Sequence, residues 1–131
     1  MKKDNILNPQ LVSAVASLGH TEFLVIADAG LPIPPTVPVI DLSLVRGIPR
    51  FVDVVKAIQG ELVVESYIYA AELPVANTNV FRKLQTLLAE SSGQEVAHEE
   101  FKELVKLSKC VVRTGECSPY ANVILTGGVN F

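Results

Sequence analysis

The sequence predicts an α/β fold in which helices flank a mostly parallel central sheet. Apolar runs rich in β-branched residues alternate along the chain with segments whose apolar residues recur at helical spacing. The composition agrees, because 49% of the 131 residues are hydrophobic and 19% are charged, which supplies enough apolar material for a buried core. We therefore expect one layered domain over residues 1–131.

The first half of the chain is predicted to form helices over residues 9–18 and 49–59 and strands over residues 23–27 and 39–42. Both helices begin at a proline start signal, the first behind an Asn cap, and both end at a glycine. The first strand is a short apolar run of β formers, typical of a strand buried on both faces. The loop over residues 28–38 contains four prolines and should be stiff.

The second half is predicted to form strands over residues 62–69, 109–113 and 122–125. A helix should begin at an Asn cap, residue 77 or 79, and end at the Ser-Ser-Gly of residues 91–93. A further helix should begin after His98 and run to residue 106. The acidic residues at positions 95, 99, 100 and 103 are expected on its solvated face.

Several function classes are excluded by composition and motifs. No apolar run approaches the length of a membrane span, and no apolar segment follows Lys2 and Lys3, so we expect neither an anchor nor a signal peptide. The net charge of −3, without a basic cluster, argues against nucleic acid as a partner. Cys110 and Cys117 have no metal-site spacing, so we expect no metal and a cytoplasmic location.

Candidate chemistry lies in polar residues at the ends of predicted elements. Asp28 follows the first strand, and ligands of α/β sheets bind outside the carboxyl ends of strands. Tyr120 and Asn122 enter the last strand. His20 follows a predicted helix C-terminus and His98 precedes a helix N-terminus, which would favour a protonated and a neutral imidazole respectively, suited to acid–base work.

Each of these residues also has a purely structural interpretation. His20 could be a helix cap and Asp28 a turn former. His98 could lie on the surface beside a helix start, and Tyr120 could be a half-buried amphipath. Lys102 could reach the pocket of His98 or simply pair with Glu99.

Taken together, most of these residues fall in segments that resemble the RbsD/FucU sugar mutarotase family. The segments are Leu18–Glu22, Val25–Pro34, and the long run Arg113–Leu125, with shorter similarities at Asn5–Asn8 and Arg46–Pro49. The run Ala29–Pro34 looks like the ribose branch rather than the fucose branch. The resemblance spans essentially the whole chain and implies the layered fold of that family.

The resemblance implies an isomerase without a cofactor that interconverts the pyranose and furanose forms of free D-ribose. His20 matches the proton donor of the family. Asp28, His98, Tyr120, Ala121 and Asn122 match its sugar-binding residues, and Asp28 could either orient His20 or accept a sugar hydroxyl. The family forms ring-shaped homo-oligomers, commonly decamers, with sites at subunit contacts.

Two other functions remain open at this point. The first is a ribose-binding accessory protein of an uptake system, which would need the same hydrogen bonds but no proton donor. The second is a fucose-type mutarotase, with a different sugar. The hydrophobic share of 49% is more than one small domain readily buries, and large exposed apolar patches usually mark interaction sites. Beside the resemblance, we interpret this excess as a sign of burial between subunits in a ring.

Overall fold

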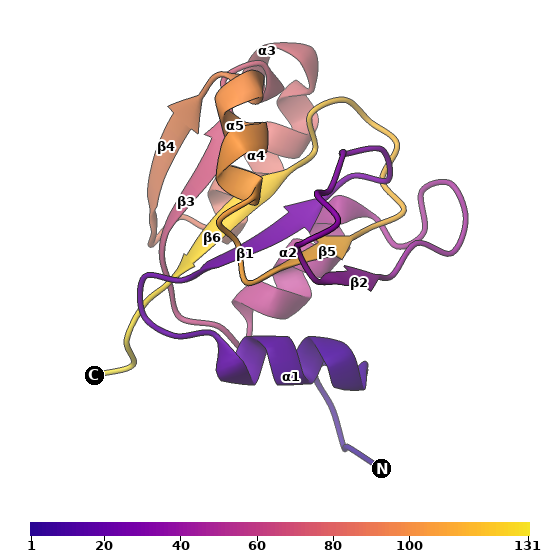
Figure 1. Ribbon diagram of the computed structural model, residues 1–131, viewed down its shortest axis with the longest axis vertical. Helices are drawn as coiled ribbons and strands as arrows, with labels where there is room; N and C mark the ends of the chain where they lie inside the picture. The colour runs from indigo at the N-terminus through magenta and orange to yellow at the C-terminus, as the bar shows by residue number, and fades with distance from the viewer.

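A six-stranded sheet forms the centre of the structure and carries helices on both faces (Figure 1). The structure is a computed structural model that describes all 131 residues. The strands are β1 (Phe23–Ala27), β2 (Val39–Asp41), β3 (Val64–Ala70), β4 (Ser92–Val96), β5 (Cys110–Arg113) and β6 (Val123–Gly127). The helices are α1 (Pro9–Ser17), α2 (Phe51–Gln59), α3 (Leu73–Ala76), α4 (Thr78–Leu87) and α5 (His98–Val105).

The strand order is β2-β5-β1-β6-β3-β4. Strand β6 pairs antiparallel with both of its neighbours, while the other adjacent pairs are parallel. Five strands therefore point one way and β6 points the other, as Figure 1 shows for the adjacent strands β1 and β6. The predicted fold class, an α/β fold with a mostly parallel central sheet flanked by helices, is confirmed.

The alternation of side chains along β1 divides the core between the two faces of the sheet. Leu24 and Ile26 join a cluster with residues of α1, α2 and α4, whereas Val25 and Ala27 join a cluster with α5. All four side chains are fully buried, as expected for a strand between two layers of helices. The apolar run at residues 23–27 is therefore a central strand because both of its faces are covered.

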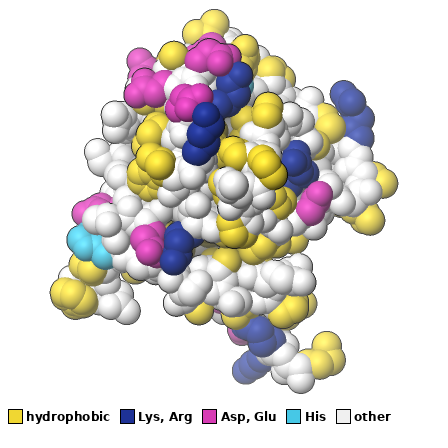
Figure 2. Space-filling view, viewed as in Figure 1, with side chains coloured by type: hydrophobic (Ala, Val, Ile, Leu, Met, Phe, Trp, Pro, Cys, Tyr) yellow, Lys and Arg dark blue, Asp and Glu magenta, His cyan; other side chains and the backbone are white.

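Helix α1 begins as its sequence predicts. The side chain of Asn8 accepts a hydrogen bond of 2.9 Å from the backbone N–H of Leu11, and Pro9 is the first helical residue. Helix α5 differs by one position, since it includes His98 as its first residue. Its outer face carries the ion pairs Glu99–Lys102 and Glu103–Lys106, and Figure 2 shows charged side chains gathered where α5 lies.

Two elements were not predicted, and one assignment was wrong. Helix α4 ends at Leu87, and Ser92 and Gly93 belong to β4 rather than to a helix end. Glu95 therefore lies on this strand and not on a helix face. The sequence of β4 is polar because it is an edge strand with four exposed residues, so no apolar pattern marks it. Helix α3 is a single turn, too short for a periodic signal.

No helix of the structure combines the length and the apolar character that crossing a membrane requires.

Gly93 is the point at which β4 packs closely on its neighbour. It lies opposite Tyr67 in the parallel pairing of β3 and β4, and a Cβ at this position would lie 2.7 Å from the tyrosine ring. We expect Gly93→Ala to lower the free energy of unfolding by about 1–3 kcal/mol, because Tyr67 is buried and cannot move aside freely. Urea unfolding measures this. Gln94→Ala, on the adjacent exposed position, is the control and should change stability little.

Candidate functional site

Most of the candidate residues meet at the carboxyl edge of the sheet. Asp28 directly follows β1, and His98 lies just beyond the end of β4. Because β6 is antiparallel, its beginning rather than its end reaches this edge, as the register of Ile26 opposite Val123 shows. The residues that precede β6, Tyr120–Asn122, therefore lie beside Asp28 although they are far away in the sequence.

Asp28 and Asn122 form a two-bond pair at the centre of this edge. The backbone N–H of Asp28 donates to Oδ1 of Asn122 over 2.8 Å, and Nδ2 of Asn122 donates to Oδ2 of Asp28 over 2.9 Å. The other carboxylate oxygen, Oδ1, accepts the backbone N–H of Gly30 at 2.9 Å. Asn122 is completely buried, so this pair fixes the orientation of the Asp28 carboxylate.

His98 and Tyr120 form a second pair at the same edge. Their ring centroids lie 5.1 Å apart at an interplanar angle of 81°, an edge-to-face arrangement that aromatic rings favour. Tyr120 holds a backbone φ of 57°, in the left-handed region that residues other than glycine seldom occupy. Nδ1 of His98 is buried and has no hydrogen-bond partner in the chain, which leaves a polar atom for a ligand to satisfy.

A loop between β5 and β6 forms the wall of a hollow beside Asp28. Thr114 donates to the carbonyl oxygen of Ala27 at 2.8 Å, and the backbone N–H of Ala29 donates to the carbonyl oxygen of Glu116 at 2.8 Å. These bonds hold the loop against the end of β1. The hollow measures about 560 Å³ and is lined by Asp28, Ala29, Gly30, Glu116, Cys117, Ser118 and Pro119. It is large enough for a monosaccharide.

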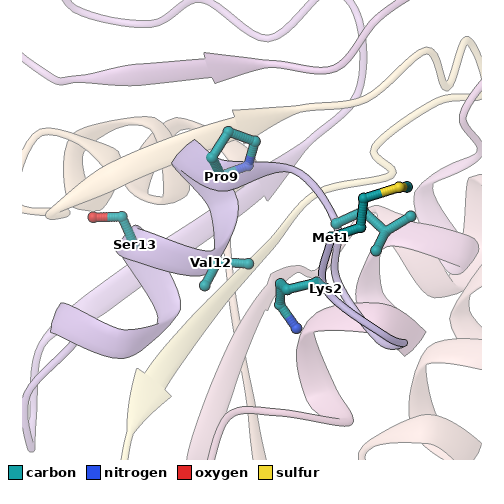
Figure 3. A pocket seen from close by; sticks show the side chains of 6 residues that line it. Met1, Lys2, Pro9, Val12 and Ser13 are labelled. Carbon is teal, nitrogen blue, oxygen red and sulfur yellow. The ribbon is translucent and has the colours of Figure 1, made fainter.

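A second hollow of similar size lies away from these candidate residues. It measures about 540 Å³ and is formed by the N-terminal segment and α1 (Figure 3). Its lining consists of Met1, Lys2, Leu7, Pro9, Val12 and Ser13. None of the candidate residues belongs to this set, and it contains no carboxylate or imidazole. We therefore place the candidate site at the carboxyl edge of the sheet.

His20 lies at the other end of β1. Strand β1 has five residues, so about 17 Å of extended chain separates the His20 turn from Asp28. The expectation that Asp28 orients His20 is therefore wrong within a single chain. Half of the His20 side chain is exposed, and Nε2 lies 3.4 Å from Oε2 of Glu65. Helix α1 ends at Ser17, so His20 lies outside its last turn.

The turn that carries His20 is held by Glu22. A carboxylate oxygen of Glu22 accepts the backbone N–H of Gly19 at 2.7 Å, and the other oxygen lies 3.4 Å from Nζ of Lys109. The hydrogen bond from Gly19, with a smaller contribution from Lys109, lowers the pKa of Glu22 below its ordinary value. The backbone N–H of Thr21 also donates to the carbonyl oxygen of Gly127 at 2.9 Å, which anchors the turn to the end of β6.

Lys102 pairs with Glu99 at 2.8 Å on the outer face of α5, which is one of the two arrangements expected for it. Ala121, between Tyr120 and Asn122, is completely buried. The supports of the site were not predicted from the sequence. Glu72 and Asn77 hydrogen-bond to the segments that carry His98 and Tyr120, but they belong to no motif that marks such a role.

Comparisons with known proteins identify the family of the chain. Residues 1–130 match the RbsD / FucU transport protein family. The chain belongs to this family. The D-ribose pyranase of Geobacillus thermodenitrificans is 50% identical over 131 residues, which are 100% of this chain and 99% of that protein. The D-ribose pyranase of Bacillus subtilis is 49% identical over the full length of both chains.

Two solved structures show the same fold. The structure of Bacillus subtilis RbsD complexed with D-ribose superimposes with a TM-score of 0.96, at 49% identity and 100% coverage of both chains. The fucose mutarotase of Streptococcus pneumoniae in complex with L-fucose gives a TM-score of 0.82 at 21% identity, with 95% of each chain covered. At that identity the second similarity concerns the fold alone.

Acidification should lower the free energy of unfolding, partly because Glu22 becomes protonated. A carboxyl group with a lowered pKa in the folded state contributes stability above its ordinary value of 4.5 and loses it as the pH falls through the folded pKa. We expect Glu22→Gln, which keeps an acceptor for Gly19 but does not titrate, to flatten this part of the pH dependence. The urea midpoint, followed from neutral pH to well below 4.5, measures the difference. If the urea midpoint fell equally with pH in both proteins, Glu22 would not be a source of this pH dependence.

Proposed function

We propose that this protein is a D-ribose pyranase, an isomerase that interconverts the pyranose and furanose forms of free D-ribose. The observation that carries the proposal is the full-length similarity to Bacillus subtilis RbsD, solved with D-ribose, at 49% identity and a TM-score of 0.96. The carboxyl edge of the sheet supports it, because it holds the fixed carboxylate of Asp28 on a hollow of monosaccharide size and carries an imidazole and a phenol as a second pair.

The reaction is a pair of proton transfers. Ring opening needs a proton delivered to the ring oxygen and one removed from the anomeric hydroxyl, and closure through a different hydroxyl reverses both. A positioned acid–base pair accelerates such steps by about 10²–10⁴-fold. In this proposal His20 delivers the proton, and the Asp28 carboxylate, oriented by the buried Asn122, accepts sugar hydroxyls. His98 and Tyr120 complete the hydrogen bonds. The main chain of Ala121 joins Tyr120 to Asn122.

We further propose that the working site joins two copies of the chain. His20 and Asp28 lie at opposite ends of β1, so one sugar cannot touch both in a single chain. Leu44, Val45 and Ile48 are 75%, 58% and 54% exposed on a hairpin. The hairpin hydrogen-bonds to Gly115 of the site loop, so a second copy that covers it would lie close to Asp28. The ring-shaped decamer and the cytoplasmic location expected from the sequence belong to this proposal.

D-Ribose is favoured over fucose as the substrate. Full-length relatives named D-ribose pyranase are 44–50% identical to this chain, whereas the solved fucose-type proteins are 21–24% identical. The two sugars also require different ring chemistry, since a fucose mutarotase exchanges anomers and a ribose pyranase exchanges ring sizes. Saturation-transfer NMR on ribose, fucose and galactose separates the two activities, and faster exchange of fucose alone would contradict the proposal.

Removing His20 should separate catalysis from binding. We expect His20→Ala to lower the protein-dependent rate of pyranose–furanose exchange by at least about 10²-fold, because the proton donor is lost. D-Ribose binding, measured by calorimetry, should survive. Lys83→Ala, at an exposed position on α4, is the control. Unchanged exchange in His20→Ala would remove this residue from the mechanism. A protein that binds ribose but never accelerates exchange would be an accessory binding protein.

Mixing two inactive variants tests the shared site. We expect His20→Ala and Asp28→Ala to be inactive separately, and a co-refolded equal mixture to recover about a quarter of the activity, since random assembly joins two intact halves at that frequency. Light scattering on the same samples measures the oligomer. A stable monomer, or a mixture that stays inactive while it co-assembles, would contradict the proposal.

A further inference from the structure

One short segment, residues 72–77, is hydrogen-bonded both to the backbone that carries His98 and to the loop that carries Tyr120. It consists of Glu72, the single turn α3 and Asn77. Its two ends hydrogen-bond to different parts of the chain, Glu72 to the start of α5 and Asn77 to the loop before β6. Neither side chain lines the hollow beside Asp28. The segment therefore touches the elements that carry His98 and Tyr120 without reaching the hollow itself.

Glu72 acts as the N-terminal cap of α5. Both carboxylate oxygens lie within reach of the backbone N–H of His98, at 3.1 and 3.2 Å. The residue in the cap position, Ala97, has no side chain that could accept this N–H. A carboxylate is also the favourable charge at a helix N-terminus. Glu72 thus fixes the backbone from which the imidazole of His98 projects.

Asn77 holds the loop that ends at Tyr120. Its Nδ2 donates to the hydroxyl of Ser118 and to the carbonyl oxygen of Pro119, both at 2.9 Å. Asn77 was one of the two residues expected to cap helix α4, but its side chain makes no cap bond there. The Pro119 carbonyl belongs to the peptide bond that leads into Tyr120, whose left-handed φ of 57° needs external support. The Asn77 amide supplies a fixed donor at that peptide.

The same loop is tied further into the fold. The Ser118 hydroxyl donates to Glu116 at 2.8 Å, and the other Glu116 oxygen accepts the backbone N–H of Phe51 at 3.1 Å. Between the two ends of the 72–77 segment, Leu73 is completely buried in the core. The segment is therefore anchored in the middle, and the positions of its two ends are set together.

We propose that Glu72 and Asn77 are positioning residues that set the distance and angle between His98 and Tyr120 for sugar binding. The proposal rests on the function proposed above for those two aromatic residues. It makes a specific chemical demand at each end of the segment. Position 72 must accept a hydrogen bond from an N–H group, and position 77 must donate one to a carbonyl oxygen.

An isosteric substitution should therefore be tolerated at position 72 and raise KM at position 77. Glu72→Gln keeps an acceptor oxygen and should leave KM for D-ribose within about twofold of the unsubstituted protein, whereas Glu72→Ala should raise KM about tenfold. Asn77→Asp keeps the shape but replaces the donor with a carboxylate oxygen, and it should raise KM about tenfold as well. The kcat should change less than KM, because the proton donor is untouched.

Thr78→Ala is the matched control. The Thr78 hydroxyl donates to Pro74 at 2.9 Å within the same part of the chain but reaches neither the site loop nor α5. We expect this variant to keep the original KM. Thermal unfolding of all variants shows whether a rise in KM merely follows a loss of stability. Raised KM in Thr78→Ala, or KM that tracks Tm across the set, would overturn the proposal.

A second measurement does not depend on activity. The chain has three tyrosines, so 3-fluorotyrosine labelling gives three fluorine signals, and Tyr120→Phe identifies the one from the site. We expect Asn77→Asp to shift the Tyr120 signal and leave those of Tyr67 and Tyr69 in place. An unmoved Tyr120 signal would overturn the positioning role. If the unsubstituted protein fails to accelerate ribose exchange, the proposed function fails, and the fluorine shift still decides the role of Asn77.

Discussion

The antiparallel placement of β6 between two strands that point the other way is the constraint on which the site depends. If β6 ran parallel to β1, its beginning would lie at the amino edge of the sheet, beside His20. The observed pairing of Ile26 with Val123 instead carries the residues before β6 to the end of β1. Asn122 then reaches Asp28 with two hydrogen bonds, and Tyr120 reaches His98. The direction of one strand thus decides which residues share an edge.

The same strand direction separates the expected proton donor from the expected sugar contacts. All of the expected sugar contacts lie at the carboxyl edge, while the expected proton donor, His20, lies at the amino edge on a turn held by Glu22 and Gly127. Within one chain these groups cannot act on one ligand. A symmetric assembly removes the difficulty, because each contact between copies can bring the amino edge of one to the carboxyl edge of the next. Oligomerisation would then be a requirement of the catalysis and not only a way to cover apolar surface.

The features predictable from the sequence were those with a local cause. The apolar run of β1 and the Asn8 cap of α1 follow from patterns within a few residues, and the mostly parallel sheet follows from the alternation of such local patterns along the chain. The polar strand β4 escaped prediction because its pairing with β3, and not its composition, makes it a strand. Asn77 shows the same limit, since its amide serves a loop 42 residues away instead of its own helix.

The candidate site was predictable as a set of residues but not as a geometry. The resemblance to a family pointed to His20, Asp28 and Asn122, yet no local pattern could show that Asp28 and Asn122, 94 residues apart, are hydrogen-bonded. The separation of His20 from Asp28 is different, because it follows from the extended geometry of β1, a strand that the sequence does predict at residues 23–27. The partner that each of these two residues meets depends on contacts that are distant in the sequence.

The hydrogen bonds of Asp28 indicate why this carboxylate suits a sugar. An ionised carboxylate has about four acceptor positions. The backbone N–H of Gly30 occupies one on Oδ1, and the amide of Asn122 occupies one on Oδ2. One position therefore remains on each oxygen, at a fixed orientation, beside a hollow of about 560 Å³. Two acceptors held side by side fit two neighbouring hydroxyl groups of one molecule. A water molecule or an alcohol with a single hydroxyl group cannot present two hydroxyl groups at that spacing. The protein bonds that occupy Asp28 thus also direct its remaining acceptors, which is the arrangement that the proposed binding of a sugar diol requires.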